Sequence, residues 1–509
     1  MLNVAEALHT QALQDPDRMA VAMGAESMTF SELDRQVNRV AHLLLQMGFV
    51  PGDRLAALLI NGLPMVELMF ATARIGVVLV PLNLRLAPGE IARQVVHARP
   101  KAVVVQDELV PLLSEAGIGG SGVQVLVSGG PTGAFPGYEA ERDAQPATSA
   151  DRDVPDTAPQ LLVYTSGTTG RPKGALRSYR SNMMVGLIAA TAVNVNRDDV
   201  GLVLLPMFHV NSFWFVSLSL AVGAACRIYP YRQFHPVRLV EQLSQYEVSL
   251  SMFVPTMLQY LAEVVEAGGP RCEGLRLILT SSAPLPPTLR DRLCNLFPKA
   301  QLYDIYGATE LGAVTLARHN QGGVAGSIGF PMIGQRVRLL DEQGNDVAPG
   351  EVGELHVAGP TNMDGYLDDP EATTAAIHGD YVSVGDLARI DEDGRIFLVD
   401  RKADMIITSA ENVYPTEVES VLLSFPGVRF AAVVGLPDQR RGEQVAAAVV
   451  PSEGVEVRIA DLAAHCRAHL ADYKCPRLWR LEKELPLGPT GKVVRRLVKQ
   501  NWQGGTIQV

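Results

Sequence analysis

Apolar residues recur at helical spacing near the N-terminus, and short continuous apolar runs follow them along the chain. A helix is predicted between Ser31, its expected N-cap, and Gly48, with an apolar face formed by Leu33, Val37, Val40, Ala41 and Leu44. Residues 55–60 predict a buried strand, residues 65–74 a helix and residues 77–80 a further strand. This strand–helix–strand order favours an α/β fold with a mostly parallel, doubly wound sheet, and the alternation returns at residues 161–303.

The pattern changes near residue 330. Short apolar runs at residues 336–340, 353–358 and 395–399, separated by turns rich in Gly, Asp and Pro, predict a small antiparallel β-barrel over about residues 325–400. Strands at residues 431–435 and 445–450 and an amphipathic helix at residues 459–470 then predict a compact α+β unit. We therefore expect a large N-terminal domain over residues 1–400 and a smaller C-terminal domain over residues 401–509. The Pro/Gly/Ala-rich stretch at residues 117–157 is expected to be surface loop.

Composition excludes several classes of protein. The chain has 509 residues, of which 47% are hydrophobic and 19% charged, which is a globular balance, and its net charge of −11 gives no broad attraction for nucleic acid or anionic lipid. The five cysteines are scattered without the spacing of a zinc site or a disulfide framework. The N-terminus has no basic and apolar leader, and the most apolar stretch, residues 55–84, contains Pro64, Glu67 and Arg74. A cytoplasmic protein without an integral membrane segment is expected.

A loop rich in Gly, Ser and Thr is the most distinctive local feature. An apolar strand ending at Tyr164 runs into Thr165, Ser166, Gly167, Thr168, Thr169, Gly170, Arg171, Pro172, Lys173 and Gly174. The glycines let the backbone approach an anion, the hydroxyls can donate to phosphate oxygens, and Lys173 adds a positive charge. No Gly-Lys-Ser/Thr sequence opens a helix here, so this is not a Walker P-loop. A flexible surface turn is the alternative, but the length of the string favours a phosphate loop.

This string resembles the signature of the adenylate-forming superfamily, which includes acyl- and aryl-CoA synthetases, firefly luciferase and the adenylation domains of peptide synthetases. Further motifs follow in the family's order over essentially the whole chain. The resemblance implies ATP, Mg²⁺ and coenzyme A as ligands and a mobile C-terminal domain. It also implies a two-step reaction, in which a carboxylate displaces pyrophosphate from ATP and a thiol then takes the acyl group from the adenylate. No protein nucleophile is needed.

The resemblance assigns nucleotide-binding roles beyond the loop. In the motif at residues 305–310, Tyr306 would stack on adenine, Thr309 would bond the α-phosphate and Glu310 would hold Mg²⁺. The segment around Ala283 would line the adenine edge. The ribose would be held by Asp386, whose carboxylate suits a vicinal diol, and by Arg401.

Two residues would act at the reacting carboxylate. Lys492, after a Pro-Thr-Gly sequence, resembles the catalytic lysine that neutralises charge during adenylation. His209 lies where the family has a histidine between the acyl and thiol channels, although a lone histidine among apolar residues is more often structural. The acyl pocket would be lined by Phe213, Trp214, Phe253, Ile305 and Gly307. This apolar set favours an uncharged fatty, alicyclic or aryl acid, although core packing would use the same residue types.

Two departures from the family pattern concern the second step. Ala403 stands at the hinge position, where the family usually has Asp or Lys. Ser409 and Ala410 replace two glycines beside the coenzyme A channel, to which Glu411 and Lys474 are also assigned. Added side chains narrow such a channel, so the altered segment bears on thioester formation.

Three functions remain open at this point. A free-standing acyl-CoA synthetase is favoured because no carrier domain follows Lys492 and because Phe208-His209-Val210 stands where amino-acid-activating domains usually place an aspartate-bearing segment. An enzyme that loads a separate carrier protein is the alternative. A nucleotide sensor without chemistry is disfavoured by the presence of Lys173, Glu310 and Lys492. The expected partners are a small carboxylic acid, ATP and coenzyme A; the oligomeric state is left open, with a homodimer as one option.

Overall fold

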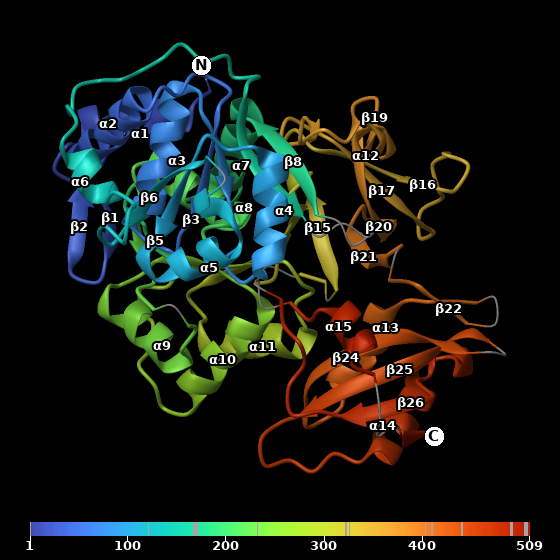
Figure 1. Cartoon of the computed structure of the whole chain (residues 1–509). Helices are drawn as coiled ribbons and strands as arrows, with labels where there is room; N and C mark the ends of the chain where they lie inside the picture. Colours follow the sequence, from blue (N-terminus) through green and yellow to red (C-terminus); the bar gives the residue numbers. More distant parts are fainter. Residues whose placement is uncertain are drawn as a thin grey trace.

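The chain forms a large N-terminal part built on two sheets and a smaller C-terminal part built on a third sheet, as seen in a computed structural model (Figure 1). The structure describes residues 2–120, 122–165, 172–231, 233–320, 323–324, 326–402, 404–408, 411–438, 441–488, 492–502 and 507–508. This mixed α/β architecture is the predicted fold class.

The first sheet has the strand order β18-β8-β7-β4-β3-β5-β6. Its strands are β3 (Arg54–Leu58), β4 (Val78–Pro81), β5 (Ala102–Gln106), β6 (Gln124–Ser128), β7 (Pro159–Thr165), β8 (Lys173–Ser178) and β18 (Gly365–Tyr366). From β6 to β7 every neighbouring pair is parallel, whereas β7 and β8 form an antiparallel pair. The helices connected with this sheet are α1 (Val4–Gln14), α2 (Phe30–Gln46), α3 (Leu63–Ile75), α4 (Pro88–Ala98), α5 (Val110–Glu115) and α6 (Tyr138–Asp143).

The second sheet has the order β16-β17-β20-β21-β15-β14-β13-β12-β11-β9-β10-β1-β2, with β19 beside β20. Its central strands are parallel and run from β13 (Gln301–Ala308) through β12 (Leu277–Ser281), β11 (Leu250–Phe253), β9 (Val200–Val203) and β10 (Ala225–Ile228) to β1 (Met19–Met23), which pairs with β2 (Glu26–Thr29). The helices between these strands are α7 (Tyr179–Val193), α8 (Val210–Ala221), α9 (Pro236–Gln245), α10 (Pro255–Glu266) and α11 (Pro287–Leu296).

The other end of this sheet is antiparallel and corresponds to the predicted barrel. Its elements are β14 (Gly312–Arg318), β15 (Ser327–Pro331), β16 (Arg336–Leu340), β17 (Val352–Ala358), α12 (Pro370–Ala376), β19 (Ile377–His378), β20 (Tyr381–Ile390) and β21 (Ile396–Arg401). Among the described residues no pairing closes β16 onto β15, so these strands form the open end of the long sheet.

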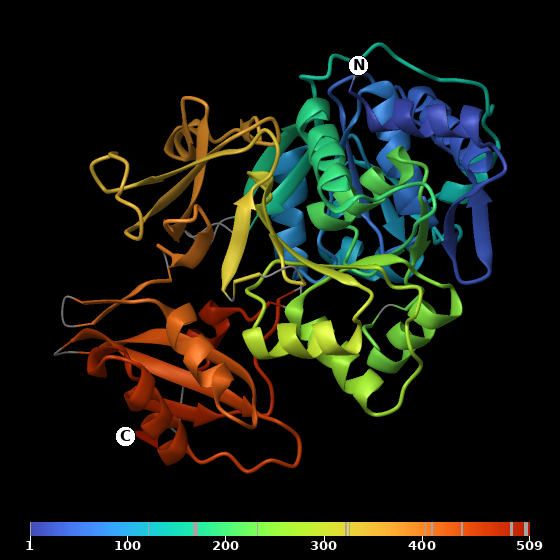
Figure 2. The same cartoon turned by 180° about the vertical axis from the view of Figure 1, so that it is seen from behind.

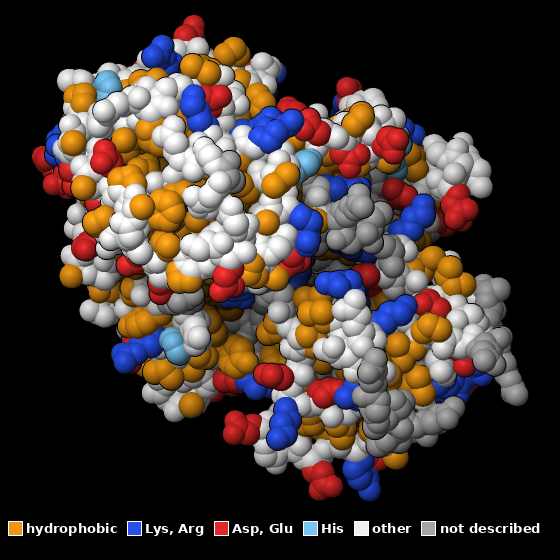
Figure 3. Space-filling view, in the orientation of Figure 1, with side chains coloured by type: hydrophobic (Ala, Val, Ile, Leu, Met, Phe, Trp, Pro, Cys, Tyr) orange, Lys and Arg blue, Asp and Glu red, His pale blue; other side chains and the backbone are white. Residues whose placement is uncertain are grey.

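The C-terminal part contains β22 (Ile406–Thr408), β23 (Glu411–Val413), α13 (Pro415–Ser424), β24 (Val428–Asp438), β25 (Gly442–Pro451), α14 (Ile459–His469), β26 (Leu478–Leu481), α15 (Arg495–Gln500) and β27 (Ile507–Gln508). It lies beside α10 and α11 of the N-terminal part in both ribbon views (Figures 1 and 2). In the space-filling view a furrow separates the two parts, and Lys and Arg side chains lie along it (Figure 3).

Two local predictions differ from the structure. Helix α2 is capped by Thr29 rather than Ser31, because Thr29 and Glu32 form a reciprocal capping box: the Glu32 amide donates to Thr29 Oγ1 at 3.2 Å and the Thr29 amide donates to Glu32 Oε2 at 2.8 Å. The stretch predicted as loop at residues 117–157 contains β6 and α6, and Tyr138 is fully buried with its hydroxyl donating to Glu67 at 2.8 Å. Composition alone did not reveal this buried anchor.

Candidate active site

The phosphate loop connects the two strands of an antiparallel hairpin. Thr165 ends β7 and pairs directly with Lys173, which begins β8, so the hairpin brings a hydroxyl and an ammonium group to the same end. The Lys173 ammonium lies 5.0 Å from the centroid of the Tyr366 ring. Ser166, Gly167, Thr168 and Thr169, assigned to phosphate binding, lie outside the described residues. The Thr165 hydroxyl and the Lys173 ammonium therefore lie at the two described ends of the loop, next to each other.

Thr309 and Glu310 occupy the turn between β13 and β14. Ala308 pairs with Gly312 across this turn, and Gly312 has a φ of +73°, a conformation that favours glycine. A side chain on Gly307 would place its Cβ 2.1 Å from the Gly312 carbonyl oxygen, so backbone closeness fixes both glycines. The tight turn sets the direction of the Glu310 side chain.

Glu310 is buried, and one of its oxygens is held by two hydroxyl groups. Thr165 Oγ1 donates to Oε1 at 3.1 Å, and the Tyr366 hydroxyl donates to the same oxygen at 3.0 Å. Glu310 thus lies next to the described end of the phosphate loop. A single carboxylate beside a polyphosphate is a typical Mg²⁺ arrangement, since Mg²⁺ takes most of its ligands from phosphates and water. No cluster of three or more His, Cys, Asp or Glu suited to a metal occurs in the part of the chain that the structure describes.

Asp386 and Arg401, the predicted ribose pair, are directly opposite one another on β20 and β21. Arg401 Nε donates to Asp386 Oδ1 at 3.0 Å, and the Tyr306 hydroxyl donates to Asp386 Oδ2 at 2.6 Å. Burial, followed by the charge of Asp386, raises the pKa of Tyr306, so its hydroxyl stays protonated and donates. The predicted adenine and ribose residues therefore form one hydrogen-bonded group across 80 positions of sequence.

Lys492, from the C-terminal part, lies close enough to Arg401 and Asp386 for their charges to act on it. Desolvation of its ammonium by nearby protein atoms, followed by the positive charge of Arg401, lowers its pKa to about 8, while Asp386 acts in the opposite direction. The residue remains exposed, so its proton can exchange with water. The charge of Lys492 is also felt at His209. The charge of Lys492 therefore interacts with both the predicted ribose pair and the predicted acyl gate, although residues 489–491 lie outside the described part.

His209 immediately precedes α8 and is largely enclosed. Its ring lies 4.6 Å from the ring of Phe208, and its Nε2 is buried without a hydrogen-bond partner among the described residues. Burial, then the charges of Arg85 and Lys492, lowers its pKa to about 4, so the imidazole is neutral at physiological pH. The preceding segment is held by Asn61, which accepts from the Met207 amide at 2.7 Å and donates to the Leu205 carbonyl at 2.9 Å.

The residues predicted to line the acyl pocket do not all lie together. Phe213, Trp214 and Ile305 are buried in the same core cluster, on the α7–α8 side of the sheet. Phe253 is fully buried in a different cluster, formed with α9, α10 and α11. Next to Ala283, Asn211 Nδ2 donates to Ser281 Oγ at 3.3 Å and to Ser282 Oγ at 3.1 Å. This polar cluster was not found from the sequence, because it joins α8 to a distant loop.

The predicted coenzyme A residues occupy the C-terminal part. Glu411 is exposed at the start of β23, and the Lys474 ammonium donates to both oxygens of Glu417, at 2.7 and 2.8 Å. Ser409 and Ala410, and the hinge residue Ala403, lie outside the described residues. The ion pair with Glu417 shows that Lys474 is engaged within its own domain in this conformation.

Sequence reasoning missed two residues that organise the site. Tyr366 lies beneath Lys173 and bonds Glu310, and Arg177 is buried behind the Thr309–Glu310 turn. Arg177 follows Ala175 and Leu176 in β8, and a charged residue in such an apolar strand was the signal that could have revealed its role. Tyr366 had none, because it reaches the site from a two-residue strand about 200 positions further along the chain than the loop.

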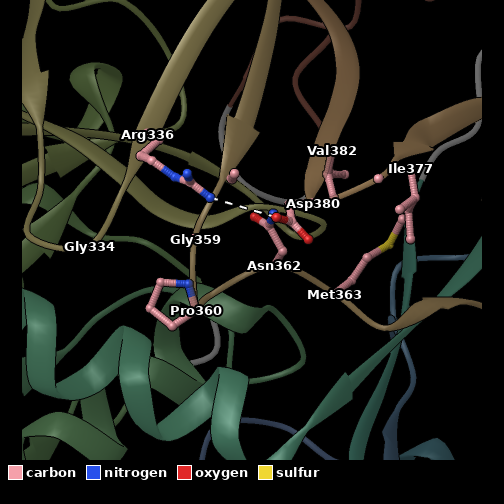
Figure 4. A pocket seen from close by; sticks show the side chains of 11 residues that line it. Gly334, Arg336, Gly359, Pro360, Asn362, Met363, Ile377, Asp380 and Val382 are labelled. Atoms are coloured by element: carbon pink, nitrogen blue, oxygen red, sulfur yellow. Dashed lines mark ion pairs between the residues drawn. The ribbon is translucent and has the colours of Figure 1, made fainter.

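The pocket shown in Figure 4 is separate from these groups. It has a volume of about 430 Å³ and is lined from the antiparallel end of the long sheet, where Arg336 points toward Asp380 across 3.8 Å. Both of these side chains are exposed, so their attraction is strongly screened by solvent. None of the predicted site residues lines this pocket.

The fold combines a large α/β part with a smaller C-terminal part, and the predicted ATP-binding residues Tyr306, Asp386 and Arg401 form one hydrogen-bonded group in it. Family comparison agrees: residues 8–367 match the model of the AMP-binding enzyme, and residues 417–492 match that of the AMP-binding enzyme C-terminal domain. The chain therefore belongs to the AMP-binding enzyme family, the adenylate-forming group that its motifs resemble.

Individual relatives align over almost the whole chain. A feruloyl-CoA synthase from Amycolatopsis is 34% identical over 494 residues, covering 97% of both chains. A fatty acid–acyl-carrier-protein ligase, ScoC, from Streptomyces coeruleorubidus is 31% identical and covers 97% of this chain and 95% of its own. The crystal structure of ATP-bound MatB from Rhodopseudomonas palustris superposes with a TM-score of 0.89 at 28% identity, covering 98% of this chain and 99% of that one. No helix in the described part of the chain is long and apolar enough to cross a membrane.

Proposed function

We propose that this protein is an acyl-CoA synthetase that activates an uncharged, largely apolar carboxylic acid with ATP and transfers the acyl group to coenzyme A. The observation that carries this proposal is the hydrogen-bonded group of Tyr306, Asp386 and Arg401, at which the charge of Lys492 is also felt. A cation there is placed to neutralise the carboxylate and the α-phosphate as they approach one another.

In the first step a carboxylate oxygen forms a bond to the α-phosphorus, and the bond to the bridging oxygen of pyrophosphate breaks. Thr165 and Lys173, paired at the end of the hairpin, would contact the phosphates, Glu310 would hold Mg²⁺ together with the phosphates, and Asp386 with Arg401 would orient the ribose. Mg²⁺ would supply charge neutralisation on the phosphates. The chain contributes mainly positioning and positive charge, which are the large terms in phosphoryl and adenylyl transfer.

In the second step a thiolate sulfur attacks the acyl carbon and AMP leaves with the bonding electrons, while the thiol proton passes to solvent. The charge of Lys492 reaches His209 in the present conformation, so we expect Lys492 to withdraw before the thiol enters. This requirement supports the predicted mobility of the C-terminal domain. Of the predicted coenzyme A residues, Glu411 is exposed and would border the incoming pantetheine, whereas Lys474 would first have to leave Glu417.

The acid class is proposed from two features of the acyl side. Phe213, Trp214 and Ile305 supply apolar and aromatic surface, whereas Asn211, Ser281 and Ser282 form a neutral polar cluster at the neighbouring loop. An aryl acid with a hydroxyl or methoxyl substituent satisfies both features. The 34% identity to a feruloyl-CoA synthase supports the same class.

The alternative acceptor is the phosphopantetheine group of a separate carrier protein. This alternative is supported by the 31% identity to ScoC, which is named a fatty acid–acyl-carrier-protein ligase. The chemistry of the two acceptors is the same at the thiol, so the adenylation step does not distinguish them.

Pyrophosphate release tests the proposal, measured with ferulic acid, 2-succinylbenzoic acid and palmitic acid, each with and without coenzyme A. We expect release with at least one acid and an acyl-CoA product, identified by mass spectrometry, only when coenzyme A is present. Release without any acyl-CoA, but with acylation of a holo-carrier protein, would replace the proposed acceptor. Absence of release with every acid, under conditions where ATP binds, would contradict the activation of this class of acids.

A further inference from the structure

Arg177 is a fully buried arginine whose three hydrogen-bond acceptors are all neutral. Nη1 donates to the Thr309 carbonyl at 2.6 Å, Nη2 to the Thr361 carbonyl at 2.5 Å and Nε to Asn182 Oδ1 at 2.9 Å. Burial lowers its pKa to about 10, which still leaves the guanidinium charged at neutral pH. A buried charge without a bonded carboxylate costs several kcal/mol, so a purely structural role would be served more cheaply by a neutral side chain.

The two carbonyl groups belong to neighbouring loops that form the nucleotide-binding turn. Thr361 Oγ1 donates to the Leu311 carbonyl at 2.6 Å, and the Met363 amide donates to the Glu310 carbonyl at 2.7 Å. Arg177 bonds one carbonyl from each loop and thereby holds them at a fixed separation. The backbone on both sides of Glu310 is anchored as a result.

The guanidinium is itself fixed from the acyl side. It lies 4.9 Å from the centroid of the Trp214 ring, and Asn182 Oδ1 accepts from both Arg177 Nε and Trp214 Nε1, the latter at 3.1 Å. Trp214 is on α8, which starts directly after His209. A continuous chain of contacts therefore runs from the acyl side, through Arg177, to the turn that carries Thr309 and Glu310.

We infer that Arg177 is a positioning residue for Mg–ATP: it fixes the Thr309–Glu310 turn and places behind it a positive charge that no carboxylate bonds. The nearest acidic influences on Arg177 are Asp364 and Glu310, neither of which bonds the guanidinium. An anionic nucleotide at the turn compensates the buried cation, so nucleotide binding gains from it. This inference rests on the proposed function only in taking Mg–ATP as the ligand of the turn.

Calorimetric titration with ATP at a series of MgCl₂ concentrations tests the inference without any acid substrate. Arg177→Lys keeps the positive charge but loses the planar guanidinium that donates to several acceptors at once. We expect the dissociation constant of Mg–ATP to rise about tenfold, with a higher Mg²⁺ concentration for half-saturation. Arg177→Gln removes the charge as well and weakens binding further. Asn182→Ala, which frees the guanidinium without altering it, weakens binding in the same direction by about threefold.

Arg74→Lys is the matched control. Arg74 is also fully buried and donates to Asp34 Oδ1 at 2.6 Å and to Asn38 Oδ1 at 2.5 Å, in a part of the fold that contributes no site residue. It should lower the melting temperature while leaving the Mg–ATP dissociation constant unchanged.

Folded Arg177 variants that bind Mg–ATP with the wild-type dissociation constant and Mg²⁺ dependence would overturn the inference. If Arg177→Lys does not fold, Asn182→Ala decides the question alone. Failure of the wild-type protein to bind Mg–ATP would instead contradict the proposed function.

Discussion

Arg429 on β24 of the C-terminal part donates from Nη2 to Glu263 Oε2 on α10 of the N-terminal part, at 2.8 Å. The same guanidinium lies 4.7 Å from the centroid of the Tyr260 ring, one turn earlier on that helix. The pair is mostly shielded, with 22% of the Arg429 side chain and 36% of the Glu263 side chain exposed. It fastens the C-terminal part in the position in which Lys492 reaches the ribose pair.

Reversing one charge of this pair should slow adenylation. If the C-terminal domain rotates between the two steps, Arg429→Glu favours departure from the present position by about 1 kcal/mol, or about fivefold in population. We expect pyrophosphate release to slow by a similar factor, while thioester formation from supplied acyl-adenylate keeps its rate. Rapid-quench measurement of each half-reaction provides the check.

The double variant Arg429→Glu with Glu263→Arg is the control, because it restores the pair with exchanged signs. It should recover most of the adenylation rate lost in either single variant. Equal slowing of both half-reactions, or no recovery in the double variant, would show that the Arg429–Glu263 pair does not favour the adenylation position of the C-terminal domain over the thioester-forming one.

Adenylation should decline as pH rises through about 8. The pKa of Lys492 is lowered to about 8 by burial and by Arg401, so the ammonium that we propose neutralises the reacting groups is lost above that pH. His209, with its pKa lowered to about 4, is already neutral and adds no change in this range. The measurement is kcat/KM for pyrophosphate release between pH 6.5 and 9.5.

Lys492→Arg supplies the control for this pH dependence, because a guanidinium stays protonated throughout the range. Its residual activity should be lower but flat above pH 8, whereas Lys492→Ala should lose adenylation and keep thioester formation from supplied acyl-adenylate. A wild-type profile that still rises above pH 9 would disprove the assignment of the essential cation to Lys492.

The sequence predicted the helices and strands better than the contacts between the candidate site residues. The βαβ order of β3, α3 and β4 followed from hydrophobic spacing, and motif order brought Tyr306, Asp386 and Arg401 into one expected site. Their hydrogen bonds depend on the β20–β21 register and on the turn after β13, which residue types alone do not define. The sequence led us to expect only the ring of Tyr306 to take part in the site. The hydrogen bond from its hydroxyl to Asp386 is therefore a finding of the structure.

The remaining differences between the sequence-based expectations and the structure have physical causes. A strand buried on both faces has no polar side, so the pattern around Phe253 could not show which core the ring enters. The segment at residues 117–157 was interpreted as loop because its Pro and Gly content outweighed the single buried anchor at Tyr138. Arg177 and Tyr366 owe their roles to close packing between loops, which leaves no periodic signal.

Removal of the Tyr306 hydroxyl should weaken ATP binding. In Tyr306→Phe the ring remains for adenine, but Asp386 loses the donor at 2.6 Å and is held only by Arg401. A hydrogen bond to a charged group contributes about 1.5–3 kcal/mol, part of which the ribose hydroxyls and water restore, so we expect the KM for ATP to rise about tenfold with little change in kcat. Steady-state kinetics with varied ATP will show this division.

The matched variant is Tyr179→Phe, since the Tyr179 hydroxyl is buried without a partner among the described residues and lies on α7 rather than at the ribose pair. It should leave the KM for ATP unchanged. A comparable rise in KM in both variants would assign the effect to general loosening of the fold rather than to Asp386.

Glu310 should determine the Mg²⁺ dependence of adenylation. Glu310→Gln keeps an acceptor for Thr165 and Tyr366 but removes the negative charge, so we expect a loss of about 100-fold in the rate of pyrophosphate release and a higher Mg²⁺ concentration for half-maximal rate. Tyr366→Phe removes only one of the two donors to Oε1 and should cost about threefold, without changing the charge at the site. Rates measured over a MgCl₂ series, with EDTA as the zero point, compare the two variants. If Glu310→Gln and Tyr366→Phe shift the Mg²⁺ midpoint equally, the carboxylate serves to brace the turn through its hydrogen bonds, and Mg²⁺ is held by the phosphates and other groups.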